Sequence, residues 1–158
     1  MAISPYMASI RSKIGSDLLL TPAAGAAVFN EAGRLLLARH DHDGLWATIG
    51  GGMEPGESPA EAALRELREE TGLEAEILGI TGAYGGPDFE VTYPGGARLA
   101  YVVTMFACRF LGGTLNLEHE ELREASWFTN DDALTLPSPP DMKAIIPDAF
   151  DWWAANRS

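Results

Sequence analysis

The chain has 158 residues, a formal net charge of −12 at pH 7, and a composition that is 46% hydrophobic and 22% charged. This length and balance fit one globular domain that buries its own core without disulfides or structural metals. The acidic charge argues against a nucleic-acid polymer as partner, because phosphate backbones are bound by clustered Lys and Arg side chains. A small phosphorylated substrate stays open, since a bound cation reverses the sign of an acidic pocket.

Cysteine content and hydropathy indicate the compartment. Cys108 is the only cysteine, which rules out an intrachain disulfide and is typical of a reducing compartment. It lies in an apolar run, 101–110, where a buried core thiol is expected in preference to a nucleophile. No apolar run reaches the ~18 residues of a membrane span, and the start of the chain lacks the basic-then-apolar order of a signal peptide. We therefore expect a cytoplasmic location and no membrane partner.

Apolar runs and turn residues define the elements in the first third of the chain. Residues 1–19 are predicted to form an N-terminal arm, weakly helical over 5–14, and residues 20–158 a single domain. A turn at 30–33 separates the first two strands, and a triple glycine at 50–52 lies between the next two. The strands predicted in this part are 23–29, 34–39, 46–49 and 51–53.

A helix is predicted over 58–71 from its own start and stop signals. Ser58 is a good N-cap, Pro59 suits the first helical position, and Glu61 completes a capping box. Gly72 supplies the left-handed residue that commonly ends a helix. At roughly 100° per residue, one apolar stripe of this helix is formed by Ala60, Ala63, Leu64, Leu67 and Thr71.

Three glutamates of this helix, Glu66, Glu69 and Glu70, fall in an arc beside the apolar stripe. Like charges at this spacing cost ~0.2–0.5 kcal/mol per pair, and the helix dipole disfavours Glu69 and Glu70 by ~0.3–1 kcal/mol each. Arg65, four residues before Glu69, offsets part of this cost. Charge counting alone is equally consistent with a solvated acidic face, but a Mg²⁺ site explains the remaining penalty, because hard cations bind carboxylate oxygens.

The remainder of the chain alternates strands with turns and ends in a helix. The run 98–110 is long and nearly continuously apolar, so it is predicted to be a central strand. The other elements expected here are strands over 75–84, 89–93 and 125–129 and a final helix over 142–156. Alternating strands and helices predict an α/β fold, with helices on both faces of a mixed sheet and helix 58–71 covering one of them.

Residues 51–73, GGMEPGESPAEAALRELREETGL, resemble the Nudix box of the MutT-type pyrophosphohydrolases. Every constrained position of that signature is matched across this stretch. The resemblance covers roughly residues 20 to 135, and it implies a Nudix-type α/β/α sandwich around a mixed sheet. One position departs from the family: Ile49 precedes the glycines where a proline is usual, which leaves the backbone less rigid at the start of the box.

The resemblance implies an enzyme that hydrolyses the pyrophosphate bond of a nucleoside diphosphate linked to another moiety. Its cofactor would be Mg²⁺, with Mn²⁺ as a substitute. The metal ligands that the resemblance implies are Glu66, Glu69, Glu70 and the carbonyl oxygen of Gly50. Arg65 would orient a glutamate through a fork-like pair without touching the substrate, and Glu57 would belong to the same network.

The base that activates the attacking water is open between two positions. The family uses either the first glutamate of the helix, here Glu66, or an acid on a later loop. In segment 117–122 the preferred candidate for the base is Glu121, followed by Glu120. The alternative is that both are surface acids without a catalytic role. Several aromatic side chains could bind the substrate by stacking: Trp46, Tyr84 and Phe89, followed by Tyr93 and Phe128. For each of them, packing in the core is the alternative.

Two other hypotheses stay open. A Nudix-fold module could bind or regulate a nucleotide without turnover, although a pure binder does not need all three helix glutamates. An isoprenyl diphosphate isomerase, a further Nudix branch, would need a cysteine and an acid facing the pocket, and Cys108 within a strand argues against it. Among hydrolases the box reads only the pyrophosphate. Oxidised or ordinary nucleoside triphosphates, ADP-ribose, sugar nucleotides and dinucleoside polyphosphates are therefore all candidates, and the chain could form a homodimer.

Overall fold

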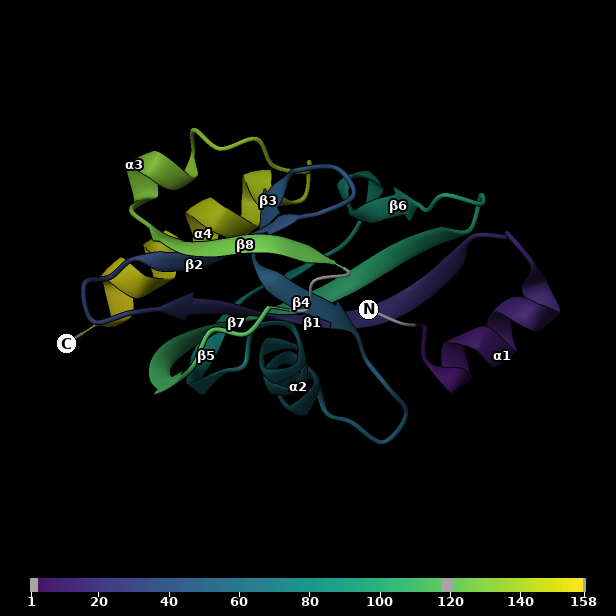
Figure 1. Cartoon of the computed structure of the whole chain (residues 1–158), viewed down its shortest axis with the longest axis horizontal. Coiled ribbons are helices and arrows are strands. Elements are labelled where there is room, and N and C mark those ends of the chain that lie inside the picture. Colours follow the sequence, from purple (N-terminus) through teal and green to yellow (C-terminus); the bar gives the residue numbers. More distant parts are fainter. Residues whose placement is uncertain (1–2, 118–120, 158) are drawn as a thin grey trace.

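The computed structural model describes residues 3–117 and 121–157, and its centre is an eight-stranded mixed sheet (Figure 1). The strands are β1 (Leu19–Phe29), β2 (Leu35–His40), β3 (Trp46–Ala47), β4 (Ile49–Gly52), β5 (Leu73–Tyr84), β6 (Glu90–Thr92), β7 (Arg98–Gly113) and β8 (Leu122–Phe128). The helices are α1 (Pro5–Ile14), α2 (Pro59–Thr71), α3 (Asn130–Ala133) and α4 (Met142–Asn156), with a 3₁₀ turn at Pro87–Phe89. Among the described residues, none of the helices has the length and apolar character that crossing a bilayer requires.

β7 is an interior strand of the sheet with neighbours on both sides, as its apolar run predicts. It pairs with β1 in parallel along the whole of that strand, from Leu19 opposite Leu99 to Phe29 opposite Arg109. On its other side it pairs with β5 in antiparallel fashion, with register shifts along the pair. The main path of the sheet is β3-β2-β1-β7-β5, while β4 pairs with β1, β6 with β7 and β8 with β2.

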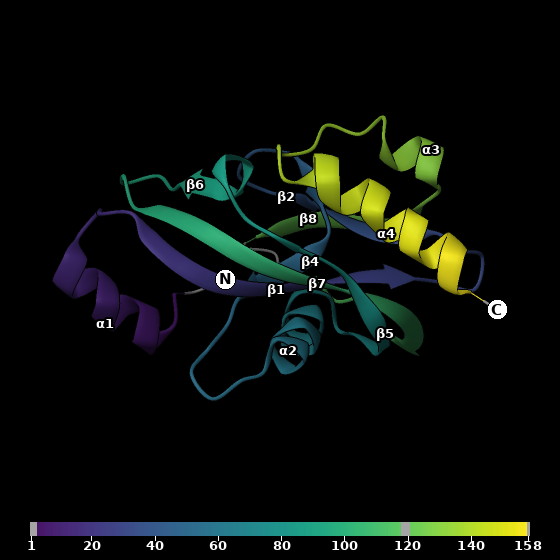
Figure 2. The same ribbon diagram turned by 180° about the vertical axis from the view of Figure 1, so that it is seen from behind.

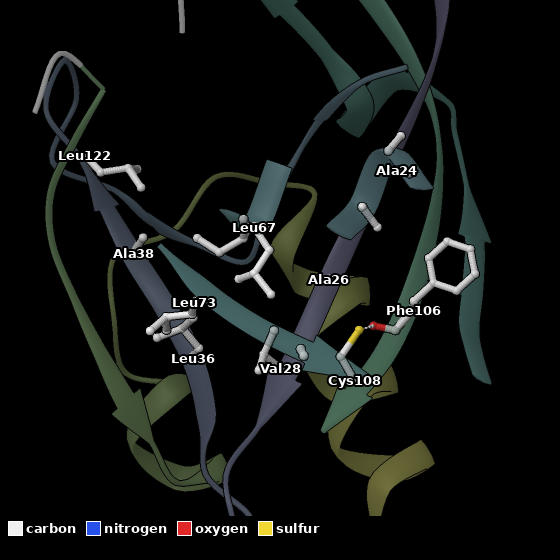
Figure 3. Packing of buried hydrophobic residues seen from close by; sticks show 14 residues of the cluster. Ala24, Ala26, Val28, Leu36, Ala38, Leu67, Leu73, Phe106, Cys108 and Leu122 are labelled. Carbon is white, nitrogen blue, oxygen red and sulfur yellow. Dashed lines mark hydrogen bonds between the residues drawn. The ribbon is translucent and has the colours of Figure 1, made fainter. Parts of the chain in front are cut away.

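The alternation of side chains along the strands divides the core into two clusters. The α2-side cluster includes Ala24, Ala26, Val28, Leu36, Leu67 and Phe106 (Figure 3). The α4-side cluster includes Ala27, Phe29, Leu37, Met105, Ile145 and Phe150. Figure 2 shows α4 and α2 on opposite faces of the sheet, so the predicted α/β/α sandwich is confirmed.

Cys108 lies in the α2-side cluster and is fully buried. Burial raises the pKa of its thiol to about 12, and the sulfur donates to the Phe106 carbonyl oxygen at 3.7 Å. A thiol in this setting is neutral near pH 7 and behaves as a small apolar group. The prediction of a core thiol is confirmed, and an isomerase would have no other cysteine in this chain to use.

α2 forms for the predicted reasons. Ser58 accepts a hydrogen bond from the Glu61 N–H at 3.2 Å, and Gly72 ends the helix with a φ of 76°. The buried face is shifted from the predicted apolar stripe: Ala60 and Leu64 are only partly buried, whereas Glu66 and Glu70 are buried, because this side of the helix packs against the sheet. The helix therefore carries two acids into the interior of the protein.

Strand pairing moves several of the predicted boundaries. β1 begins at Leu19, inside the predicted N-terminal arm, because it pairs with β7 from its first residue. β6 covers only Glu90–Thr92, since Pro87–Phe89 forms a 3₁₀ turn at the start of the predicted strand. The short helix α3 has no counterpart among the predicted elements; Thr129 caps it by accepting a hydrogen bond from the Asp132 N–H at 3.2 Å.

Candidate active site

Arg65 on α2 is the hub of a polar network between the helix and β4. Its Nε and Nη2 donate to the two carboxylate oxygens of Glu57 at 2.6 and 3.0 Å, in the fork-like geometry that the sequence predicts. Nη1 donates to Glu66 at 3.0 Å and to Glu69 at 3.2 Å, and Nη2 also donates to the Gly52 carbonyl oxygen at 3.1 Å. These five hydrogen bonds match the five N–H donors of a guanidinium group. Arg65 therefore orients protein groups and has no donor left for a substrate.

Glu57 ties the loop between β4 and α2 to this network. A hydrogen bond from Arg65 holds the pKa of the Glu57 carboxyl below its usual range. Glu57 also accepts a hydrogen bond from the Glu54 N–H at 2.8 Å. One ionised side chain thus fixes both the arginine and the loop beside it.

Glu66 is the most deeply placed acid of the network, with no exposed surface. Burial raises the pKa of its carboxyl group, while a hydrogen bond from Glu70 and the charge of Arg65 act in the opposite direction. Among the described residues, no N–H or hydroxyl group donates to its Oε2 atom. A Cβ atom on Gly51 would lie 2.5 Å from its Oε1 atom, so a glycine at position 51 is what leaves room for this carboxyl group.

The other two glutamates of α2 differ in exposure. Glu70 is buried and shares a hydrogen bond with Glu66, whereas Arg65 holds Glu69 at the surface with 49% of its side chain exposed. Two carboxyl groups in hydrogen-bond contact need a proton or a cation between them. Within residues 3–117 and 121–157, no three His, Cys, Asp or Glu side chains are grouped closely enough to hold a metal ion. The structure thus brings two of the three predicted glutamate ligands together, and the convergence of Glu69 with them stays a prediction.

Gly50, whose carbonyl oxygen is a further predicted metal ligand, lies in β4 opposite Gly25 of β1. A Cβ atom there would come within 2.9 Å of the Ala24 carbonyl oxygen, so the close strand pairing needs glycine. Ile49, at the position where the family usually has proline, is buried in the α2-side cluster and pairs with Ala26. Packing and strand pairing hold the start of the box here, while ligation by the Gly50 carbonyl stays a prediction.

A cavity of about 330 Å³ adjoins the network. Its walls come from α1 and the residues before it, from the loop at 52–54, and from the β6–β7 hairpin with the start of β7. Glu121, the predicted base, lines the same cavity just before β8. Glu120, the second candidate, lies outside the described residues. The cavity therefore joins the arginine network, through Gly52, to the later acid that the sequence singled out.

Trp46, Tyr84 and Phe89 do not line this cavity. Trp46 and Phe89 are buried in the α4-side cluster, and Tyr84 stacks on Phe89 with ring centroids 5.7 Å apart. The Tyr84 hydroxyl donates to Asp148 of α4 at 2.7 Å, and burial raises its pKa. These contacts pack the three side chains on the α4 side of the sheet, away from this cavity, while their role in substrate binding stays a prediction.

Tyr93, a further candidate for stacking, does line the cavity. Its hydroxyl oxygen lies 2.8 Å from that of Tyr101, which the sequence does not mark as a site residue because it belongs to a nearly continuous apolar run. Strand alternation, which places Leu99 and Tyr101 on one face, is the signal that could have found it. Met7 and Arg11 also line the cavity. A weak helix far from the box gives no reason to expect them there.

The fold and the network together define the class of the protein. A mixed sheet lies between helical layers, as in the Nudix class. Glutamates of α2 are buried next to the glycines of β4, and Arg65 donates a hydrogen bond to the deepest of them, Glu66. The family model described as NUDIX domain matches residues 19–149. The chain belongs to the NUDIX family.

Similarity to individual proteins supports the same family. One relative is a protein of Bacillus subtilis (strain 168) that is named as a putative 8-oxo-dGTP diphosphatase. It is 40% identical over 72 residues, which are 46% of this chain and 48% of that protein. The NAD-capped RNA hydrolase NudC of Pseudomonas aeruginosa (strain LESB58) is 30% identical over 126 residues, which are 78% of this chain and 41% of NudC. The matches thus span less than half the length of these relatives.

A solved structure of an ADP-ribose pyrophosphatase from Streptococcus suis 89-1591 resembles the whole domain. It superposes with a TM-score of 0.65 at 26% identity, covering 87% of this chain and 92% of that one. This match covers far more of that protein's length than the matches to the longer relatives cover of theirs.

Proposed function

We propose that the protein is a Mg²⁺-dependent pyrophosphohydrolase that cleaves the pyrophosphate bond of a nucleoside diphosphate linked to another moiety. The observation that carries this proposal is the buried Glu66 carboxyl group beneath Gly51, in hydrogen-bond contact with Glu70. No N–H or hydroxyl donor among the described residues reaches its Oε2 atom. Buried acids are ordinarily hydrogen-bonded or bound to a cation, so this pair fits a cation site.

The carboxyl groups of Glu66, Glu69 and Glu70 and the carbonyl oxygen of Gly50 would hold the metal. All of these donors are oxygen atoms, which are the ligands that Mg²⁺ prefers; Mn²⁺ accepts the same set. When bound, the cation offsets the charge that spreads over the phosphate oxygens and makes bound water more acidic.

The protein groups around the site have the task of positioning. Arg65 holds Glu66 and Glu69 in place, and its hydrogen bond to the Gly52 carbonyl oxygen fixes the strand beside them. Because Glu57 takes two of its donors, the guanidinium group cannot turn away without breaking an ion pair that is largely shielded from water. This rigidity would keep the acids aligned during the reaction.

We assign the base that takes a proton from the attacking water to Glu121, with Glu66 as the alternative. Glu121 lines the cavity, where a water molecule next to the substrate could lie within hydrogen-bond reach of it. Glu121→Gln should lower kcat and leave the affinity for Mg²⁺ unchanged, whereas Glu66→Gln should lower both. Equal kcat for Glu121→Gln and the wild type would transfer the role to Glu66.

The substrate that we propose is a small molecule. The relatives are named for an oxidised nucleotide, an NAD-capped RNA and ADP-ribose, and the nucleoside diphosphate unit is the chemistry that these names share. The net charge of −12 disfavours a nucleic-acid polymer, and we infer a cytoplasmic enzyme from the single cysteine, which is buried and reduced.

A substrate panel tests the proposal. The purified full chain is incubated with Mg²⁺ and each of ADP-ribose, UDP-glucose, NAD, diadenosine tetraphosphate, dGTP and 8-oxo-dGTP, and the released phosphate species are identified. Cleavage of the pyrophosphate bond in at least one compound, abolished by a chelator and restored by Mg²⁺, is the expected result. Tight binding of these compounds without any cleavage would favour the non-catalytic module instead.

A further inference from the structure

One wall of the cavity lies outside the segment that defines the family. The NUDIX match begins at residue 19, whereas Met7 and Arg11 of α1, with Ile3 and Ser4 before them, line the cavity. Figure 1 and Figure 2 show α1 beyond the end of the sheet where β1 begins, apart from α2 and α4. The helix therefore lies outside the matched segment and forms part of the boundary of the site.

α1 is held in place by few contacts. None of its residues is fully buried, so the core does not fix its position. Arg11 joins it to the domain: Nη2 donates to the carbonyl oxygen of Arg98, the first residue of β7, at 2.6 Å, and Nη1 donates to the Asp17 carbonyl oxygen at 2.8 Å. With Arg11 bound in this way, α1 is set against the start of β7 rather than against the core.

The lining of the cavity favours an uncharged occupant. Met7, Met53 and Leu99 are apolar, and the two neighbouring hydroxyls of Tyr93 and Tyr101 offer hydrogen bonds without charge. Burial and the nearby Tyr93 raise the pKa of Tyr101, so this hydroxyl stays neutral.

The charges around the cavity exclude an anion. Glu54 and Glu121 are the acids of the lining, and both guanidinium Nη atoms of its arginine, Arg11, donate to carbonyl oxygens. A phosphate group would meet more negative than positive charge there. A flat, uncharged aromatic ring with N–H and carbonyl groups meets no such penalty, and the volume of about 330 Å³ lies at the small end of the ~300–1,000 Å³ typical of ligand sites.

We propose that this cavity binds the nucleoside part of the substrate and that α1, through Met7, determines which nucleoside is accepted. The inference rests on the proposed function, because it assigns the moiety next to the pyrophosphate. Gly52 lines the cavity and its carbonyl oxygen accepts a hydrogen bond from Arg65. A nucleoside bound with its 5′ oxygen next to Gly52 would direct that oxygen towards the Arg65 network.

Binding of nucleosides without phosphate tests the cavity alone. Adenosine, guanosine, cytidine and uridine are titrated into the metal-free full chain and followed by saturation-transfer NMR. Met7→Trp places a larger ring in the cavity, and Tyr6→Trp is the matched control, since Tyr6 is on the same helix, is half exposed and does not line the cavity. We expect Met7→Trp to weaken binding by about tenfold or more and Tyr6→Trp to change it by less than about twofold.

If α1 moved away from the new Trp side chain, Met7→Trp would leave the cavity open, so a second variant on another wall is also measured. Ala97→Phe enlarges a residue on the hairpin wall of the same cavity, so it should weaken binding as Met7→Trp does. Wild-type affinity in both variants would overturn the proposal. So would the absence of binding of any of the four nucleosides to the wild type.

Kinetics distinguish this inference from the proposed function. On the best substrate of the panel, Met7→Trp should raise KM by about tenfold and leave kcat within about threefold, because Met7 would contact the nucleoside and not the reacting phosphorus. If the wild type hydrolyses the substrate and Met7→Trp has the same KM, the assignment of the cavity to the nucleoside is refuted, while the proposed hydrolase function is not. Nucleoside binding that depends on Met7, in a protein that cleaves nothing, refutes the function and leaves the cavity assignment standing.

Discussion

The site has two sides: the α2 wall, which is Arg65 with the acids of α2 and adjoins the cavity without lining it, and the α1 wall, which lines the cavity with Met7 and Arg11. In the α2 wall Arg65 makes five hydrogen bonds and Glu66 is fully buried, whereas in the α1 wall no helix residue is fully buried and Arg11 makes the hydrogen bond to β7. The α2 wall holds Glu57 and Glu66 firmly against Arg65. The α1 wall can shift while the sheet stays intact, because few buried contacts oppose its opening. The contrast fits two tasks: reacting atoms need a fixed geometry, while the variable part of a substrate can be recognised by a wall that adjusts.

The largest expected effect lies on the α2 wall. Glu70→Gln keeps the shape of the side chain but removes a charge from the acid pair, so kcat should fall by about 100-fold or more, or roughly 3 kcal/mol. Arg68→Gln is the control, since Arg68 is half exposed and pairs with Glu74 at 3.2 Å on the outer face of α2. It should change kcat by less than about threefold.

Circular dichroism is recorded for both variants beside the rates. Equal losses in the two folded variants would show that the acids of α2 have no special role, and the contrast between the walls would fail.

The next effect concerns the space that Gly51 leaves for Glu66. In Gly51→Ala the new Cβ atom meets the Glu66 carboxyl group at 2.5 Å, so the free energy of unfolding of the metal-free protein should fall by about 1–3 kcal/mol. Gly52→Ala is the matched control, because a Cβ atom there meets nothing within 4 Å. Its free energy of unfolding should stay within about 0.5 kcal/mol of the wild-type value. Urea unfolding measures both, and equal stability of the two variants would mean that the α2 wall tolerates movement.

The pH dependence of the free energy of unfolding gives a third test of the α2 wall. Because burial raises the pKa of Glu66, folding favours its protonated form; this stabilisation is complete below the unfolded pKa and is lost as pH rises through the folded pKa. Glu66→Gln is neutral at every pH. In metal-free protein it should therefore exceed the wild type in stability above that range, by about 1.4 kcal/mol per unit of pKa shift, and match it below.

Thermal unfolding of both proteins across the acidic to neutral range checks this difference. Calorimetry should also show the Mg²⁺ affinity of the wild type increasing with pH, since protons and the cation compete for the same oxygens. A stability difference that does not depend on pH would exclude a raised pKa for Glu66.

The smallest effect is expected on the α1 wall. Arg11→Gln removes the hydrogen bond that joins α1 to β7, so the cavity should open more often and KM should rise by about threefold to tenfold, with kcat nearly unchanged. Lys13→Gln, an exposed change of the same charge on the same helix, should leave KM within about twofold. A loss in kcat rather than KM would place α1 in the chemistry and remove the distinction between the walls.

Much of the α2 wall could be predicted from local rules. Capping by Ser58 and Gly72 depends on residues within a few positions of each other, and so does the contact between Arg65 and Glu69. The interior position of β7 follows from its apolar run, because its segment 105–108 is covered on both faces and must be apolar on both. These features depend on the order of nearby residues, which the sequence contains in full.

Long-range contacts decided the rest. Whether Trp46, Tyr84 and Phe89 meet a substrate or the core depends on which face of the sheet α4 covers, and the structure places them under α4. The hydrogen bond from Arg11 to Arg98 joins residues 87 positions apart. The sequence by itself determined the capped helix and its acids, since helical periodicity is local. The burial of Glu66 and the cavity closed by α1 arise only when distant segments pack together, because burial is a property of neighbours that the local pattern does not name.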